Sequence, residues 1–404
     1  MREGADGRLA TLLGLLLPTS KMRVSRLRDV LATNSITLER GELNPPGYVP
    51  LSNYRILDKR NLALREAVEG RYFTVKAGVS LDEGDLKALE GYMGMYSWEE
   101  AENLILAQAP NYARVYTYVF HSERLRRQAR EMLGTFLYDG VLRKAFVVVG
   151  EPNIGKSVLA DTYKRVMGEL ASSIPLSVLF GKDNRRVMGE LAGKYVNITC
   201  ESPEGLLRAV DWFKMVTGDE ELTGEVKYER PFRFWNRIKL VIFCNEIPLF
   251  SRVDEAVLDR LYIIESEAES IPAGREDSAL RERIRREWKY VFMHILLCYK
   301  MLEERGFKLL HAPSREEVLN YVKERAAIIS EFIDLYCETG EGYVVKGTKF
   351  VEAFLKYCGE AGITNPPGRN TIYAQLSYLG FEKVLRRDGV YFKGLRLRDE
   401  AALL

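Results

Sequence analysis

The sequence GEPNIGKS at residues 150–157 follows the apolar run AFVVV at 145–149 and leads into a helical pattern that continues to residue 161. This order of strand, glycine-bordered loop and helix is the context that a phosphate-binding loop requires. The two glycines let the backbone wrap an anion, so that successive N–H groups and the helix N-terminus point at it. Lys156 is predicted to neutralise the β- and γ-phosphates of a nucleotide, and Ser157 to bind Mg²⁺. An incidental glycine-rich turn is the alternative.

Short apolar strands alternate with helices on the carboxyl side of this loop. Strands are predicted at 145–149, 195–200, 239–244 and 261–265. Their brevity and almost continuous apolar character are typical of a parallel sheet that is covered on both faces. The sequence therefore predicts an α/β core, followed by one long helix over residues 278–305.

Polar side chains come directly after two of these strands. Glu201 follows the second strand, where a carboxylate can hold Mg²⁺ through water or polarise the attacking water. A solvent-exposed acid at the end of a strand is the alternative, and Glu204 is the reserve choice for the same role. Asn245 follows the third strand, and its amide can hydrogen-bond the γ-phosphate and the lytic water, although asparagine at a strand end is also common turn chemistry.

Two further regions flank the α/β core. Between residues 60 and 138 the apolar positions recur at helical spacing, and a cluster of arginines between 124 and 130 is either a solvated helix face or a nucleic-acid contact. After residue 313, helices at 318–337, 349–357 and 370–379 and a hairpin at 383–398 form the pattern of a winged helix-turn-helix.

The C-terminal tail carries an excess of basic side chains. Residues 369–398 hold seven basic and two acidic residues. A basic wing beside a recognition helix is the expected footprint of a DNA-binding surface, and a basic surface on a purely structural cap is the alternative. The predicted DNA contacts here are Arg369, Arg386, Arg387 and Lys393.

Composition limits the remaining classes of function. The 404 residues have a formal charge of +2, with 47% hydrophobic and 29% charged side chains, which is ordinary for a folded globular chain. Apolar runs are too short for a membrane span. The five cysteines are odd in number and widely separated, which favours buried thiols in a reducing compartment, and the three histidines form no metal-binding pattern.

The order of these motifs resembles the superfamily 3 helicases of the AAA+ class, especially the branch joined to primases in phages, plasmids and large DNA viruses. The resemblance covers about 120 residues and rests on five segments, which are GEPNIGKS at 150–157, YVNITCE at 195–201, FKMVTGDEELTGEVKYERPFRF at 213–234, KLVIFCNEIP at 239–248 and AVLDRLYIIE at 256–265. The segment ITLERGEL at 36–43 and the C-terminal tail also resemble the flanks of that family.

The resemblance implies a role for each matching residue. Lys156 and Ser157 bind phosphate and Mg²⁺, Glu201 is the Walker B acid, and Asn245 is the sensor. Arg260 matches the arginine finger that reaches into a neighbouring subunit's site, which requires a ring; an arginine paired with a nearby aspartate is the alternative. The nucleotide contacts it implies are Gly150, Glu151, Pro152, Asn153, Ile154, Gly155, Lys156, Ser157 and Val158.

A predicted hairpin between residues 219 and 234 matches the family's channel hairpin, whose basic residue contacts the DNA backbone. Lys227 is the first choice for that contact, followed by Lys214 and Arg230, and a solvated hairpin face is the alternative for each. The sequence departs from the family at Cys200, where many ATPases have a second acid, and at Ile154, where the primase-linked branch often has asparagine.

We therefore expect an AAA+ P-loop core at 141–312, a helical oligomerisation domain at 60–140, an N-terminal segment with a basic helix at 1–59 and a winged-helix domain at 313–404. The expected function is an ATP- and Mg²⁺-dependent hexameric replicative DNA helicase of a virus, phage or plasmid. It would translocate 3′ to 5′ on single-stranded DNA, unwind forked DNA in the host cell cytoplasm, and work with a primase or polymerase.

Two other functions remain open. One is an ATP-switched origin-binding initiator or regulator that does not unwind processively, and strand displacement on a forked duplex separates it from a helicase. The other is a packaging or remodelling ATPase. The heptapeptide RVMGELA occurs twice, at 165–171 and 186–192, and the sequence gives it no function.

Overall fold

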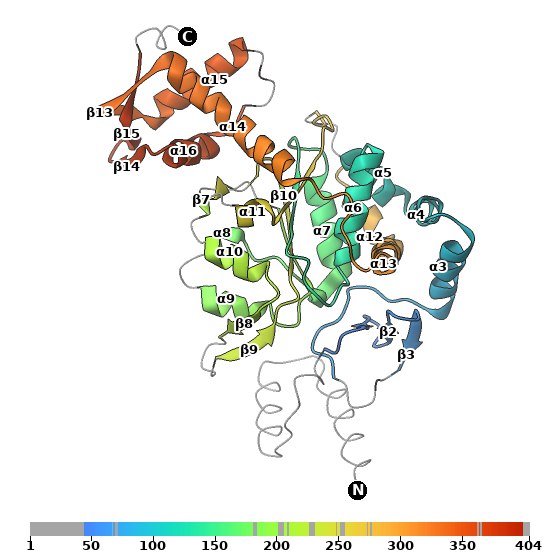
Figure 1. Cartoon of the computed structure of the whole chain (residues 1–404). Coiled ribbons are helices and arrows are strands. Elements are labelled where there is room, and N and C mark those ends of the chain that lie inside the picture. The colour runs from blue at the N-terminus through green and yellow to red at the C-terminus, as the bar shows by residue number, and fades with distance from the viewer. Residues whose placement is uncertain are drawn as a thin grey trace. The chain divides into compact units, whose positions relative to one another are not determined.

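A five-stranded parallel sheet forms the centre of the chain (Figure 1). The computed structural model describes residues 44–66, 68, 72–180, 184–200, 206–207, 210–225, 231–247, 249–250, 255–272, 274, 277–361, 363 and 366–398. Two units are distinguished, Met1–Pro45 with Val68–Phe73 and Pro46–Ala67 with Thr74–Leu404. Every helix and strand below belongs to the second unit.

The strand order of the central sheet is β12-β4-β10-β6-β5. The strands are β4 (Ala145–Val149), β5 (Ala171–Ser172), β6 (Val196–Cys200), β10 (Lys239–Cys244) and β12 (Leu261–Glu265). All neighbouring strands are parallel. The four predicted strands are therefore confirmed, while β5 is too short to give a sequence pattern.

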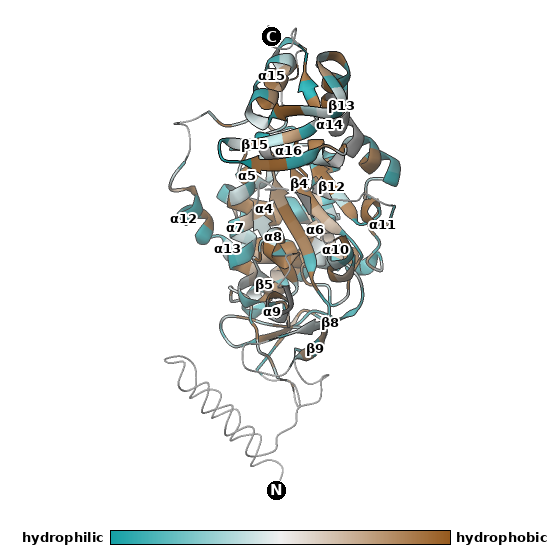
Figure 2. Cartoon of the chain, turned by 90° about the vertical axis from the view of Figure 1, so that its left-hand side faces the viewer, coloured by the Kyte–Doolittle hydropathy of each residue, from teal (hydrophilic) through white to brown (hydrophobic). Residues whose placement is uncertain are grey.

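Both faces of β4, β10 and β12 are buried, because alternate residues of these three strands enter different hydrophobic cores. Phe146 and Val148 of β4 belong to one core, whereas Val147 and Val149 belong to the other. Figure 2 shows the apolar colouring of β4 and β12. This two-sided burial explains why the strands read as continuous apolar runs rather than as alternating ones.

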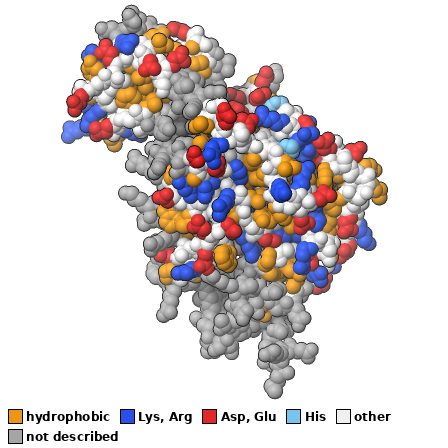
Figure 3. Space-filling model, in the orientation of Figure 1, with side chains coloured by type: hydrophobic (Ala, Val, Ile, Leu, Met, Phe, Trp, Pro, Cys, Tyr) orange, Lys and Arg blue, Asp and Glu red, His pale blue; other side chains and the backbone are white. Residues whose placement is uncertain are grey.

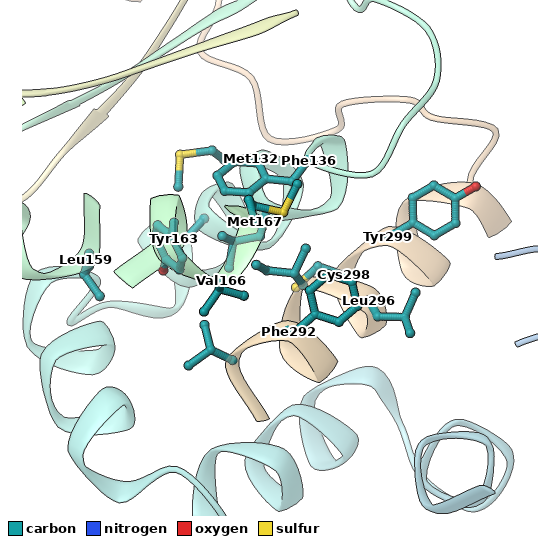
Figure 4. Close-up of a cluster of buried hydrophobic side chains, with 14 of the residues drawn as sticks. Met132, Phe136, Leu159, Tyr163, Val166, Met167, Phe292, Leu296, Cys298 and Tyr299 are labelled. Carbon is teal, nitrogen blue, oxygen red and sulfur yellow. The ribbon is translucent and has the colours of Figure 1, made fainter. Parts of the chain in front are cut away.

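Several helices contribute side chains to the core on the first face. They include α3 (Glu83–Met95), α4 (Trp98–Ala107), α5 (Pro110–Val119), α6 (Glu123–Thr135), α7 (Lys156–Met167) and α13 (Trp288–Glu304). Side chains of α6, α7 and α13 meet in one buried cluster, which includes Phe136, Tyr163 and Phe292 (Figure 4).

One predicted helix is wrong in extent. The sequence predicts a single helix over 278–305, but the structure has α12 (Leu280–Arg285) and then α13. Glu287 lies at the break, and its carboxylate accepts hydrogen bonds from the backbone N–H groups of Asn111 and Tyr112 at 3.1 and 2.8 Å. The side chain thus caps the N-terminus of α5, a contact that helical periodicity does not reveal.

Shorter elements contribute to the core on the second face. The 3₁₀ turn η2 (Gly168–Leu170) follows α7, and the second core then receives side chains from α8 (Leu176–Leu179), α9 (Asn184–Glu190), α10 (Val210–Val216) and α11 (Glu255–Leu258). Strands β8 (Glu221–Gly224) and β9 (Phe232–Trp235) form the predicted hairpin, and β7 (Leu206–Leu207) pairs with β11 (Leu249–Phe250).

The two ends of the described chain carry small antiparallel sheets. Strands β1 (Tyr48–Pro50), β2 (Ile56–Asp58) and β3 (Ala63–Arg65) form the first, which the sequence did not predict. The C-terminal elements are α14 (Arg315–Tyr336), β13 (Cys337–Lys346), α15 (Gly347–Glu360), α16 (Arg369–Tyr378), β14 (Glu382–Arg386) and β15 (Gly389–Leu397). Three helices and a terminal hairpin thus occur where the sequence predicts them. Within the described residues, none of the helices combines the length and apolarity that a bilayer crossing needs.

Candidate nucleotide-binding site

The loop between β4 and α7 needs glycine at both of its ends. Gly155 has a φ of 102°, a left-handed conformation that favours glycine. A Cβ atom on Gly150 would lie 2.8 Å from Ile154 Cδ1 and 3.0 Å from Ser266 Cβ. A side chain at either position would therefore strain the loop or clash with its surroundings, and glycine keeps the loop backbone free to wrap an anion.

Lys156 begins α7 and is 6% exposed. Its ammonium donates hydrogen bonds to the carbonyl oxygens of Gly150 at 2.7 Å and Glu151 at 2.5 Å. Burial lowers the pKa of Lys156, an effect opposed by Cys244, Cys200 and Glu151. Among the described residues, no carboxylate forms an ion pair with this ammonium, so its charge is solvated only by neutral carbonyl groups. A phosphate group fits this donor set, with the Ser157 hydroxyl as the Mg²⁺ ligand.

The ends of the strands bring a second predicted residue to the loop. Cys244 of β10 is in register with Val149 of β4, so Asn245 follows at the level of Gly150, where the loop begins. Cys200, the last residue of β6, is exposed at the same edge of the sheet. Glu201 and Glu204 lie outside the described residues, and their predicted roles stay predictions.

A cleft of about 880 Å³ opens beside the loop. Its walls come from α5, from the loop and the start of α7, and from residues around α12. They include Val115, Tyr118, Asn153, Ser157, Leu280 and Arg281. The mixture of apolar side chains and loop backbone suits a nucleotide, whose base is flat and whose phosphates are charged. Sequence reasoning missed the walls from α5 and α12, because nothing in their local pattern differs from an ordinary helix.

Arg260 lies at the opposite edge of the sheet. Its carbonyl oxygen accepts a hydrogen bond from the N–H of Ala145, the first residue of β4, whereas the phosphate loop follows the last residue of that strand. The guanidinium donates to the Ala256 carbonyl at 2.8 Å, and its buried Nε atom has no hydrogen-bond partner within the described residues. Arg260 and Lys156 of one chain therefore lie at opposite ends of β4.

The base of the β8–β9 hairpin is fixed by a buried asparagine. The Asn236 side-chain amide donates to the carbonyl oxygens of Val216 at 2.6 Å and Gly218 at 2.8 Å. It thereby joins the end of β9 to the end of α10, the helix that carries Lys214. Lys227 and Arg230 lie outside the described residues.

The C-terminal basic residues fall into two groups. Arg369, Arg386 and Arg387 are exposed, and the Arg386 guanidinium lies 4.5 Å from the ring centroid of Tyr391. Lys393, in contrast, pairs with Glu382 at 3.1 Å. Acidic and basic side chains are interspersed over this part of the surface (Figure 3). Arg396 pairs with Glu338, which lies outside residues 369–398, so part of the counted excess of positive charge is compensated locally.

Comparisons with known proteins give partial similarities. A family of unknown function, DUF5906, matches residues 148–260. A protein of Acanthamoeba polyphaga mimivirus that bears the name "Putative helicase L207/L206" is 26% identical over 214 residues, which cover 47% of this chain and 22% of the viral protein. This chain thus spans less than a quarter of that relative.

Solved structures also match in part. Two apo structures of the NrS-1 C-terminal region have TM-scores of 0.43 and 0.42 with 15% identity. The matches cover 70% and 71% of this chain, and 74% and 76% of the NrS-1 chains.

Proposed function

We propose that this chain is an ATP-driven DNA helicase of the superfamily 3 type that acts in the replication of a virus or related element. The observation that carries the proposal is the surroundings of Lys156, a buried ammonium whose partners among the described residues are all carbonyl groups, in a glycine-bordered loop beside a cleft. The similarity to the viral protein named as a helicase supports the same reading. Lys156 would neutralise the phosphates, Ser157 would hold Mg²⁺, and Glu201 and Asn245 would orient the attacking water.

The position of Arg260 supports the proposal that the chain acts in a ring of subunits. Because this arginine lies at the far end of β4 from the phosphate loop, it can act on a nucleotide only in a neighbouring copy. Its Nε atom, which has no partner in the described part of the chain, is consistent with a guanidinium that completes its contacts at an interface. In this proposal Arg260 stabilises charge on the γ-phosphate from the next subunit, and a hexamer is the expected assembly.

Two surfaces would contact DNA. The hairpin β8–β9 would carry Lys227 towards a central channel, with Lys214 and Arg230 as further candidates. The C-terminal elements would act as a winged helix through Arg369, Arg386 and Arg387, whose side chains are exposed. Lys393 would contribute less, because Glu382 already compensates its charge.

The direct test measures ATP hydrolysis with and without single-stranded DNA, together with strand displacement on a forked duplex. We expect DNA-stimulated turnover and unwinding in the wild type, and neither in Lys156→Ala. Turnover without strand displacement would favour the initiator or regulator, for which the exposed C-terminal arginines would serve site recognition. Full turnover in Lys156→Ala would contradict the nucleotide site itself.

A further inference from the structure

A second cation faces the same cleft from α12. The guanidinium of Arg281 donates to Asp161 Oδ2 at 3.2 Å, to the Ser157 carbonyl oxygen at 3.4 Å and to Ser157 Oγ at 3.5 Å. The two contacts to Ser157 are longer than the 2.7–3.2 Å typical of an N–H···O hydrogen bond. Asp161 therefore provides the main contact of a side chain that is half exposed and borders the cleft.

Asp161 does not depend on Arg281 for its own charge balance. Arg165, one turn further along α7, donates its Nε–H to the same carboxylate oxygen at 3.0 Å. If the Arg281 guanidinium turned away, the carboxylate would keep a cationic partner. Breaking the contact between Arg281 and Asp161 therefore costs little free energy.

A second arginine among the described residues that line the cleft is held differently. Arg114 of α5 pairs with Asp277 at 3.0 Å, and Asp277 also binds Arg283. Arg283 in turn donates to Asn111 at the start of α5. Arg114 thus belongs to a network that connects α5 with α12, whereas Arg281 has one shared carboxylate and a position beside Ser157. Of the two, Arg281 is the cation that an anion next to Ser157 would attract.

We infer that Arg281 is a nucleotide-binding residue that contacts the phosphates from within the same chain, and that Asp161 competes with the phosphates for its guanidinium. This inference rests on the proposed nucleotide site. The planar guanidinium can bind two phosphate oxygens at once. Such a bidentate contact is stronger than the exposed ion pair that Arg281 forms with Asp161. Arg281 would then add to the positive charge of Lys156 and draw α12 towards the bound nucleotide.

The competing explanation is that Arg281 only bridges α12 and α7 structurally. Two variants distinguish this explanation from a role in nucleotide binding. In our inference, Arg281→Ala weakens nucleotide binding, whereas Asp161→Asn leaves it unchanged or tightens it, because the competing carboxylate is gone. For a structural bridge, both variants break the same contact, and both weaken binding alike.

The experiment is isothermal titration of the full chain with a non-hydrolysable ATP analogue in Mg²⁺. We expect Arg281→Ala to bind about tenfold more weakly, as the loss of one charge-assisted hydrogen bond implies, and Arg281→Lys to restore part of the affinity. Arg285→Ala is the matched control on the same helix, since Arg285 forms an exposed pair with Glu282; its affinity should equal that of the wild type. Circular dichroism checks the fold of each variant.

The outcomes separate this inference from the proposed function. Unchanged affinity in Arg281→Ala, or a loss of affinity in Asp161→Asn, overturns the role of Arg281. If the wild type itself binds no nucleotide, the proposed function fails as well. Binding that is lost in Lys156→Ala but kept in Arg281→Ala would leave the proposed function standing and remove only the inference made here.

Discussion

Buried lysines occur at both ends of the strands of the central sheet, but in different surroundings. We call these ends the carboxyl edge and the amino edge of the sheet. At the carboxyl edge, the Lys156 ammonium donates to two backbone carbonyl groups and has no carboxylate partner among the described residues, and its loop lies beside a cleft. At the amino edge, the fully buried Lys59 donates to Asp139 Oδ2 at 2.8 Å and to the Leu137 carbonyl at 2.5 Å. A cation with a fixed carboxylate is compensated inside the fold, whereas a cation with carbonyl partners alone leaves a charge that an incoming anion can neutralise.

Asp139 organises the amino edge. Its carboxylate also accepts hydrogen bonds from the Tyr195 hydroxyl at 2.6 Å and the Gly47 N–H at 2.8 Å. Burial opposes its ionisation, yet the nearby Lys59 ammonium lowers the pKa of Asp139 below its usual range. Lys239 lies in the same cluster and also donates to backbone carbonyl groups. Burial lowers its pKa well below the ordinary value, and the nearby charge of Asp139 opposes this shift. Burial of a lysine among carbonyl groups is therefore no sign of function by itself, and Lys156 differs because its glycine-bordered loop lies beside a cleft.

The largest expected difference between the two edges concerns turnover. Lys156→Met should reduce ATP hydrolysis by more than about a hundredfold, because it removes the charge that stabilises the transferred phosphoryl group. Its free energy of unfolding should stay unchanged or rise, since a buried charge is replaced by an apolar side chain of similar length. Measurements of ATP turnover and of urea unfolding on the same preparation check the expected loss of activity and the expected stability. A destabilised variant would mean that Lys156 is structural after all.

The amino edge should respond in the opposite way. Asp139→Asn leaves the buried Lys59 ammonium without its carboxylate, and we expect the free energy of unfolding to fall by about 3 kcal/mol. ATP turnover per folded molecule should persist at temperatures well below the unfolding transition. Urea denaturation followed by fluorescence measures the first effect. Loss of turnover in a fully folded variant would contradict the view that the amino edge serves stability and the carboxyl edge serves ATP hydrolysis.

The helices on the first face of the sheet give a test in which stability depends on pH. Glu102 accepts hydrogen bonds from His294 at 2.8 Å and Arg130 at 2.9 Å. Burial opposes its ionisation, but these two partners lower the pKa of Glu102 from 4.5 to about 2. Because the ionised form is favoured in the fold, its contribution to stability is present above pH 4.5 and is lost as the pH falls towards 2.

We expect this loss to amount to about 3 kcal/mol over that range, spread over more than two pH units. Urea unfolding at pH 5, 3.5 and 2.5 measures it. Glu102→Gln, which does not titrate, should be less stable at pH 5 and should decline less steeply with acid. An equal decline in both proteins would show that other carboxylates govern the acid sensitivity.

Much of the fold could be predicted where residues act through local patterns. The four longer strands of the central sheet and the helices after residue 313 follow from hydrophobic periodicity. The break at Glu287 could not be predicted, because it depends on a hydrogen bond to Asn111, far away in the chain. The sheet β1-β2-β3 was also missed, since strands of three residues give almost no periodic signal.

The candidate site divides in the same way. The candidate phosphate loop could be predicted from eight consecutive residues, because the chemistry proposed for it resides in its own backbone and in Lys156 and Ser157. The cleft walls from α5 and the approach of Arg281 could not be predicted, since they depend on how distant helices pack. Arg281 has no local pattern that distinguishes it from neighbouring surface arginines.

The repeated heptapeptide RVMGELA separates most clearly what the sequence determines from what the tertiary structure determines. In the first copy α7 ends at Met167, and Gly168 has a φ of 57°. The backbone of Gly78 lies so close that a Cβ on Gly168 would be 2.5 Å from the Gly78 nitrogen. In the second copy α9 continues through Gly189 to Glu190. The sequence alone determined which of these side chains are apolar and that a glycine follows them. Only the tertiary structure decided whether the helix stops at that glycine, because the neighbouring backbone selects one of two conformations that glycine adopts at similar cost.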